Sequence, residues 1–277
     1  MGKREVSTLG TRHAIRVIVP DSHGAHADAG ACAALLRDVN SLDPDEIVLL
    51  GDHLDCGGTF SAHQRNYSAE ITESYVDDLS AAIGLLDGLA KAAPRARVHY
   101  LEGNHEGHVE RWCARNFERK QDADLVLDRI GPEQSLGLKK RGITYYKRSV
   151  HYQGLSIPGT IRLGKCHFTH GICFSAHAAH AHLIRFGANV VFGHVHRSQS
   201  VVERTVTSDG HGAWCPGTLA KLQPLYRHTT PTSWSHGYGL QFVNQATGTF
   251  VHWNVPIYKG QSLLLDAIDT IHKRKRK

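Results

Sequence analysis

The sequence predicts an α/β fold, and three observations support this prediction. Through the first half of the chain, short apolar segments typical of buried strands alternate with segments typical of amphipathic helices. The second half contains more strand-like segments. With 277 residues, of which 41% are hydrophobic, the chain is long enough to form a sizeable core. Strand–helix–strand alternation predicts a parallel sheet with right-handed crossovers.

The first half is expected to contain three strands joined by helices. The strands are expected at residues 14–19, 46–50 and 97–101. An Ala- and Leu-rich segment at 26–39 predicts the first helix. Residues 68–92 predict a longer one, because apolar residues recur every three or four positions and Pro94 lies just beyond the last of them.

The second half is expected to combine further helices with a second set of strands. Helices are expected at 106–120, 121–130 and 175–186, strands at 143–147, 165–169 and 190–192, a hairpin at 240–244 and 249–254, and a loop at 229–239. No linker divides the chain. We therefore expect residues 1–272 to form a single domain, followed by a basic, disordered tail at 273–277.

Charge and hydropathy exclude some classes of protein. The tail accounts for five of the six net positive charges, so the rest of the chain gives no electrostatic case for nucleic-acid binding. No apolar run approaches the ~20 residues of a membrane helix. The first residues also lack the apolar stretch of a secretory signal. We expect a cytoplasmic protein that does not bind membranes.

Five short polar motifs follow five of the predicted strands. They are Asp21-Ser22-His23-Gly24, Gly51-Asp52-His53-Leu54-Asp55, Gly103-Asn104-His105-Glu106, His170-Gly171 and Gly193-His194-Val195-His196. Because the carboxyl ends of strands line the ligand crevice of an α/β sheet, these side chains are expected to converge. Imidazole, carboxylate and amide oxygen together suit borderline divalent ions. The motifs contain no thiolate, which argues against a closed structural zinc site.

In this order the motifs resemble the signature of the calcineurin-like metallophosphoesterase superfamily, which reads DxH, GDxxD, GNH(E/D), H and GHxH. The matching region runs from Asp21 to His196. The resemblance implies a four-layer αββα sandwich of two mixed sheets. It also implies a hydrolase of phosphoesters that uses two divalent metal ions, with Mn expected first and Fe, Zn, Co or Ni as alternatives.

The resemblance further implies a role for each motif residue. The implied metal ligands are Asp21, His23 and His196 for one ion and Asn104, His170 and His194 for the other, with Asp52 bridging both. His105 is implied to be a general acid or phosphate-orienting group, with Asp55 holding its imidazole. Arg111 and Arg115 follow on the next predicted helix and are candidate phosphate clamps. A solvated helix face is the alternative reading of these two arginines.

The chain departs from the Ser/Thr protein phosphatase branch of this superfamily at two positions. That branch holds phosphate with arginines directly after GDxxD and directly before GNHE, where this chain has Cys56 and Glu102. We therefore expect a phosphodiester substrate, either a nucleotide or a nucleic acid, as for related phosphodiesterases and nucleases. The overall layout is similar to calcineurin-like phosphoesterases of bacteria and their phages.

Two alternatives remain open at the level of sequence. The first is a phosphomonoesterase or protein phosphatase. The second is a non-enzymatic scaffold on the same fold, for which the retromer subunit is a precedent. That subunit has lost key catalytic histidines, whereas here every ligand position is filled. The sequence does not indicate an oligomeric state.

Overall fold

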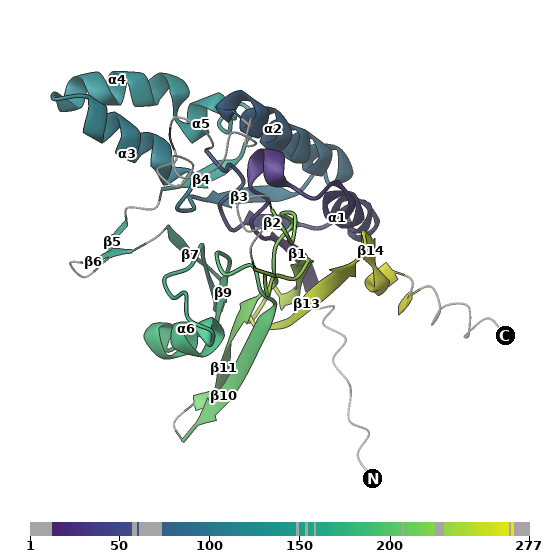
Figure 1. Ribbon diagram of the computed structural model, residues 1–277. Coiled ribbons are helices and arrows are strands. Elements are labelled where there is room, and N and C mark those ends of the chain that lie inside the picture. Colours follow the sequence, from purple (N-terminus) through teal and green to yellow (C-terminus); the bar gives the residue numbers. More distant parts are fainter. Residues whose placement is uncertain are drawn as a thin grey trace, which may run out of the picture.

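Two mixed β-sheets lie face to face between helices in the computed structural model of the chain (Figure 1). The structure describes residues 13–56, 60, 74–147, 150–152, 155–157, 159–206, 208–224, 230–265 and 267–268. The first part of the expected helix at 68–92 and the basic tail at 273–277 lie outside the described residues.

The larger sheet is built around four parallel strands. These are β1 (His13–Val19), β2 (Glu46–Leu49), β3 (Arg97–Leu101) and β4 (Thr144–Tyr146). On the other side of β1, three strands continue the sheet with antiparallel pairing: β12 (Gly237–Asn244), β13 (Phe250–Tyr258) and β14 (Gln261–Ser262). The order is β14-β13-β12-β1-β2-β3-β4. Because β1, β2 and β3 are parallel, the segments that follow them leave from one edge of the sheet.

The smaller sheet has the strand order β10-β11-β9-β8-β7. Its strands are β7 (Thr160–Leu163), β8 (Cys166–Thr169), β9 (Val190–Phe192), β10 (Gln199–Thr205) and β11 (Ser208–Cys215). The neighbours β8 and β9 are parallel, so the segments after them also leave together. A separate hairpin is formed by β5 (Val150–Tyr152) and β6 (Leu155–Ile157).

The helices are α1 (Ala29–Leu42), α2 (Tyr75–Ala92), α3 (Gly107–Asn116), α4 (Lys120–Ile130), α5 (Pro132–Ser135) and α6 (Ala178–Phe186), with a short 3-10 turn η1 at Gly24–His26. The start of α2 is fixed by a capping box, in which the Ser74 and Asp77 side chains each bond to the other's backbone amide. Asp28 caps α1 in a similar way by accepting a hydrogen bond from the Ala31 amide.

Three apolar clusters show how the layers pack. The first joins α1 and α2 to the outer face of the larger sheet and includes Leu35 and Leu86. The second lies between the sheets, where Ile18 of β1 shares a cluster with Phe168 of β8. The third joins Leu183 of α6 to the outer face of the smaller sheet. The order is thus helix, sheet, sheet, helix, which confirms the predicted αββα sandwich.

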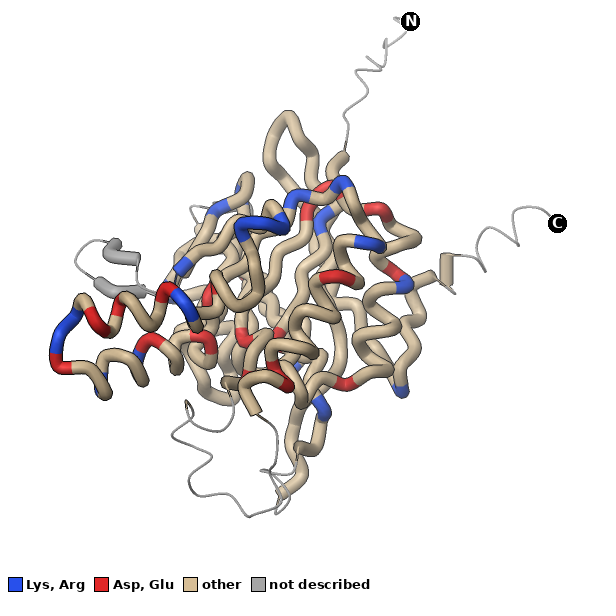
Figure 2. Tube along the Cα trace, turned by 90° about the horizontal axis from the view of Figure 1, so that it is seen from above, with Lys and Arg blue, Asp and Glu red and all other residues tan. Residues whose placement is uncertain are grey.

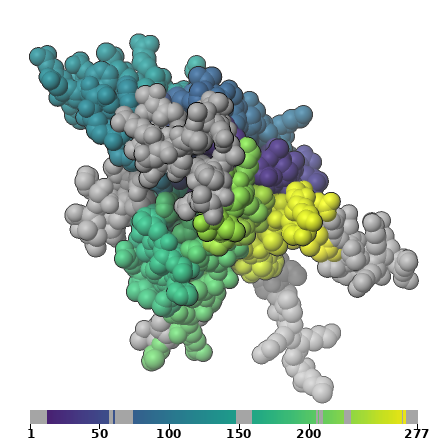
Figure 3. Space-filling view, viewed as in Figure 1, coloured from purple at the N-terminus to yellow at the C-terminus, as the bar shows by residue number. Residues whose placement is uncertain are grey.

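The last strands of the larger sheet lie beside the first helix of the chain. There the yellow C-terminal segment lies against the purple N-terminal one in the space-filling view (Figure 3). Helix α1 contacts both β13 and β14. The late strands are therefore part of the same packed unit as the first half of the chain.

Most predicted elements are confirmed. Strands β5, β6 and β7 were not predicted, and β12 begins at Gly237, inside the expected loop at 229–239. The largest omission is the hairpin β10–β11. Its strands read QSVVERT and SDGHGAWC, so polar residues and glycines interrupt the apolar pattern. β10 is an edge strand of the smaller sheet, and edge strands commonly carry polar residues. The first helix also begins later than predicted, at Ala29, because residues 24–26 form the turn η1.

Helices α3 and α4 project from the body as a pair (Figure 1). Between Gly107 and Ile130 they carry five basic and five acidic residues, and both signs lie along this pair in Figure 2. This projection therefore does not offer the basic stripe expected of a nucleic-acid surface. Among the described helices, none has the length and apolar character needed to span a membrane.

Candidate metal centre

The five motifs lie directly after five strands, three in the larger sheet and two in the smaller one. Asp21 follows β1, Asp52 follows β2, Asn104 follows β3, His170 follows β8 and His194 follows β9. Two motif glycines are required by close packing, because a Cβ atom on Gly103 would collide with the Asp52 carboxylate and one on Gly193 with that of Asp21. The strand ends therefore bring the motif side chains together, as predicted.

The backbone of these loops is unusually bent. Four of the implied ligands have positive φ angles, namely His23 (54°), Asp52 (51°), His194 (69°) and His196 (56°). Such values are uncommon for residues other than glycine, and they concentrate at functional sites where the surrounding structure enforces them. These bends lie in the loops whose side chains converge.

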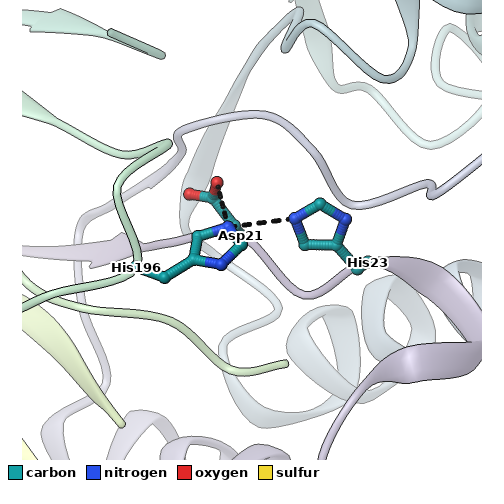
Figure 4. A group of neighbouring side chains, drawn as sticks. All are labelled: Asp21, His23 and His196. Atoms are coloured by element: carbon teal, nitrogen blue, oxygen red, sulfur yellow. Dashed lines mark hydrogen bonds and ion pairs between the residues drawn. The ribbon is translucent and has the colours of Figure 1, made fainter. Parts of the chain in front are cut away.

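The first group of convergent side chains comprises Asp21, His23 and His196 (Figure 4). Nε2 of His196 lies 3.1 Å from Oδ2 of Asp21 and 3.0 Å from Nε2 of His23. All three residues are buried. Burial alone raises the pKa of Asp21, but His170 and His196 outweigh it and lower the pKa to about 2. The group thus presents a carboxylate and two imidazoles.

The second group surrounds Nε2 of His170. This atom lies 2.9 Å from Oδ1 of Asn104, 3.0 Å from Nδ1 of His194 and 3.1 Å from Oδ2 of Asp52. The same Asp52 oxygen lies 4.0 Å from Nε2 of His23 in the first group. Asp52 therefore stands between the two groups, as the resemblance implies for a bridging ligand.

The arrangement of hydrogen-bond acceptors fits divalent cations. Nδ1 of His170 donates to the Leu50 carbonyl at 2.9 Å, so Nε2 is the nitrogen that would lose its proton and offer a lone pair to a cation. Nε2 then faces two oxygens and another imidazole nitrogen. A proton on Nε2 can satisfy one of these three acceptors, whereas a cation can satisfy all of them. The donor set of nitrogen and oxygen atoms suits Mn, Fe, Co, Ni or Zn.

His105 lies at the edge of the centre, with its side chain 20% exposed. Its ring centroid is 4.6 Å from that of His23. Nδ1 of His105 lies 2.9 Å from the Asp55 carbonyl and 3.3 Å from Oδ1 of Asp55. Burial lowers the pKa of His105, but Asp52 and Asp55 outweigh it and raise the pKa to about 10. The structure thus pairs His105 with Asp55 and favours the charged imidazole.

The carboxylate of Asp55 is shared, which the sequence did not indicate. Its Oδ1 is closer to Nδ1 of His23, at 2.8 Å, than to Nδ1 of His105. A proton on Nδ1 of His23 leaves Nε2 of that ring with a lone pair that faces the centre. Asp55 therefore orients a ring of the first group as well as His105, in the manner of the carboxylates that orient metal-binding histidines.

Glu106, the last residue of the GNHE motif, has a structural role that sequence reasoning missed. Its buried carboxylate accepts hydrogen bonds from the backbone amides of Asp52, His53, Leu54 and Gly103 and from the Tyr100 hydroxyl. It thereby holds the loop that carries Asp52 against the loop that carries Asn104. Glu106 belongs to the GNHE motif, but only the structure shows which backbone amides donate to its carboxylate.

Replacing Glu106 with Gln is expected to destabilise the protein by at least about 2 kcal/mol. Oε2 accepts two backbone amides and Oε1 accepts two more, so either orientation of the Gln amide leaves two buried donors unsatisfied. Urea unfolding measures the loss. Glu110→Gln on the exposed face of α3 is the control and should change stability by less than about 0.5 kcal/mol. Equal stabilities for the two variants would contradict this role.

The two arginines proposed as phosphate clamps lie at different distances from the motifs. The Arg111 guanidinium donates to the carbonyl of Asn104 at 2.7 Å, so it contacts the motif loop itself. Arg115 lies one turn further along α3 and donates to the carbonyl of Arg111 at 3.1 Å. The structure therefore brings Arg111 to the edge of the site and leaves Arg115 on the exposed helix.

The positions that hold phosphate-binding arginines in protein phosphatases are both buried here. Cys56 is fully buried, and burial raises the pKa of its thiol well above the usual value. Glu102 is buried and accepts a hydrogen bond from the Tyr145 hydroxyl at 2.9 Å. It lines a cleft behind the motif together with Glu106 and Glu110. Neither position supplies a cation to the centre.

No family model and no curated protein matches the chain. Among solved structures it is similar to a predicted phosphoesterase from Streptococcus pneumoniae, at 14% identity and a TM-score of 0.32, covering 87% of this chain and 98% of that one. YfcE, a phosphoesterase from E. coli, is similar at 14% identity and a TM-score of 0.34, covering 87% of this chain and 98% of that one. Vacuolar protein sorting 29 from Cryptosporidium parvum is similar at 12% identity and a TM-score of 0.39, covering 90% of this chain and 94% of that one.

At these identities and TM-scores the likenesses carry no conclusion about activity. The strand orders and the apolar cluster between the sheets define the architecture of this chain. This architecture agrees with the one that the motif resemblance implies. The chain is a four-layer αββα sandwich, with two mixed sheets packed face to face and the five motifs at the ends of their strands.

Proposed function

We propose that this chain is a dinuclear metal-dependent phosphoester hydrolase that prefers phosphodiesters, such as nucleotides or nucleic acids. Asp21, His23 and His196 would hold one ion, and Asn104, His170 and His194 the other, with Asp52 bridging both. Mn²⁺ is the first ion expected, and a cytoplasmic location stays a prediction.

One observation carries this proposal above all. Oδ2 of Asp52 lies 3.1 Å from Nε2 of His170 and 4.0 Å from Nε2 of His23, so a single carboxylate oxygen faces both groups of donors. A bridging carboxylate is what two adjacent cations require. The scaffold alternative has no comparable support, because every implied ligand side chain is present and turned toward the centre.

The chain's own residues divide the chemical work. Two divalent ions in such a site supply Lewis-acid activation of the phosphoryl group and of a water nucleophile. His105 would donate a proton to the leaving oxygen, since its charged ring is held by Asp55 at the edge of the centre. Asp55 would also fix the tautomer of His23 and so keep its Nε2 available. Arg111 would add a positive charge beside the Asn104 loop.

A turnover assay tests this proposal. Protein treated with EDTA should lose hydrolysis of bis(p-nitrophenyl) phosphate and regain it when Mn²⁺ is added. A panel of Mn²⁺, Co²⁺, Ni²⁺, Zn²⁺ and Mg²⁺ then identifies the preferred ion. Activity that is unchanged in EDTA would contradict metal dependence, and absence of turnover with every ion would favour the scaffold alternative.

The substrate class gives a second expected result. A monoester dianion carries more charge than a diester, and sites for it add arginines to the metals. Here Cys56 and Glu102 occupy the positions of those arginines. Bis(p-nitrophenyl) phosphate should therefore be hydrolysed with a higher kcat/KM than p-nitrophenyl phosphate. Both release the same leaving group, so the comparison isolates the charge of the phosphate. A clear preference for the monoester would refute the diester proposal and make Arg111 the next residue to mutate.

A further inference from the structure

Phe174 places an exposed aromatic ring beside the proposed metal centre. It lies in the loop between β8 and α6, four residues after His170, and is 61% exposed. Its ring centroid is 4.4 Å from that of His194, with the planes inclined by 52°. One side of the ring thus contacts an implied ligand while much of the residue faces solvent.

The loop that carries Phe174 is anchored on both sides. The Ile172 amide donates to Nε2 of His182 at 2.9 Å, and Arg197 donates to the Ser175 carbonyl at 2.9 Å. The next carbonyl, of Ala176, accepts from the Gln199 side chain at 3.1 Å. The backbone position of the exposed ring is therefore fixed in advance. A ligand that binds the ring does not have to order this loop first, which favours binding.

A second ring lies beside the other histidine of the GHxH motif. The Trp234 centroid is 4.2 Å from that of His196, with an interplanar angle of 78°. Its loop is also anchored, because the Ser235 amide donates to the His196 carbonyl at 2.9 Å and Ser235 Oγ accepts from the Ser198 amide at 2.7 Å. Two anchored loops from distant parts of the sequence thus place aromatic rings on His194 and His196.

A single exposed phenylalanine is ordinary and needs no ligand to explain it. Phe174 differs because its ring contacts a residue of the centre and its loop is held in place. A planar aromatic partner can stack on such a ring without any particular hydrogen-bond pattern. Nucleotides carry such a partner at a short distance from the phosphate.

We propose that Phe174 is a specificity-determining residue that stacks on the nucleobase of a phosphodiester bound at this centre. The inference rests on the proposed function and narrows it, because it selects nucleotidyl esters over simple alkyl esters. Trp234, which is only partly exposed, lies beside His196 and is not assigned to the base.

Two substrates with one leaving group test this role. Thymidine 5′-(p-nitrophenyl phosphate) and methyl p-nitrophenyl phosphate are both monoanionic diesters that release p-nitrophenolate, and they differ in the group that stays on the phosphate. Phe174→Ala should lower kcat/KM for the thymidine ester by roughly 5- to 100-fold, the range for a lost base–aromatic stack. It should lower the value for the methyl ester by a much smaller factor, so that the ratio of the two values falls at least fivefold.

Further variants separate stacking from bulk. Phe174→Trp restores a flat ring and should restore the preference for the thymidine ester, whereas Phe174→Leu restores only apolar volume and should not. Tyr258→Ala removes a similarly exposed aromatic residue from β13 and should leave kcat/KM unchanged for both esters.

The outcomes distinguish this inference from the proposed function. If Phe174→Ala lowers kcat/KM equally for both esters, the residue supports His194 and does not bind a base, and the inference is overturned. If Phe174→Leu restores the thymidine ester fully, stacking is also overturned. If the unmodified protein hydrolyses neither ester with any metal, the proposed function itself fails.

Discussion

Replacing Asp52 with Asn is expected to weaken metal binding and to lower kcat/KM for bis(p-nitrophenyl) phosphate by more than about 100-fold. Even residues that only orient metal ligands change metal affinity or activity by roughly 10- to 100-fold when mutated. Oδ1 of Asp52 accepts a hydrogen bond from the His105 amide at 2.8 Å, and the Asn carbonyl can keep it. The Asn NH2 group then takes the place of Oδ2, 3.1 Å from Nε2 of His170. That group cannot bind a cation, so the variant removes the bridge with little change of shape.

Isothermal titration with Mn²⁺ and a turnover assay measure the two effects of this substitution. Asp38→Asn is a matched control, because it also removes a buried carboxylate. Asp38 lies on α1 and accepts a hydrogen bond from the hydroxyl of Tyr238 on β12. The control should bind Mn²⁺ as the unmodified protein does. Normal metal binding by Asp52→Asn would show that this residue does not bridge the ions.

His105→Ala is expected to slow hydrolysis by roughly 10²–10⁴-fold while leaving metal binding intact. The reason is geometric. His105 contacts Asp55 through Nδ1 and is partly exposed. It shares a third cluster with His23 and Asp55, but the two donor groups on either side of Asp52 are made by other side chains. Loss of a proton donor matters most when the leaving group is a poor one. The effect should therefore be largest for alkyl diesters and smallest for p-nitrophenyl diesters.

A series of diesters with leaving groups of increasing pKa measures this dependence. His180→Ala is the control, since this exposed histidine pairs with Glu203 on β10, away from the motif loops. A variant that lost its metals would instead make His105 a ligand. An equal rate loss across the series would show that it orients the phosphate and does not donate a proton.

The fold followed from the sequence where the apolar pattern was continuous. β1 and β2 were recognised because buried strands are apolar on both faces, and β3 because it ends on a short apolar, buried segment. The hairpin β10–β11 was missed because polar residues and glycines interrupt the apolar pattern of both strands. The layer order came from the family resemblance, and the three apolar clusters confirm it.

The site could be predicted only as a set of residues. Five motifs after five strands implied convergence, and the distances around His170 and Asp52 agree with it. The shared use of Asp55 by two histidines and the five donors to Glu106 could not be predicted, because they depend on where backbone amides and ring nitrogens lie. Phe174 gave no signal in the sequence, since one phenylalanine in a loop is ordinary. The roles of the motif residues in catalysis remain predictions.

Anomalous diffraction from crystals grown with Mn²⁺ tests the central claim most directly. The account predicts two peaks separated by roughly 3.5–4 Å, the usual spacing in two-metal sites. One should lie among Asp21, His23 and His196, the other among Asn104, His170 and His194, with the Asp52 carboxylate between them. A single peak, or peaks that do not contact Asp52, would contradict a dinuclear centre in this chain.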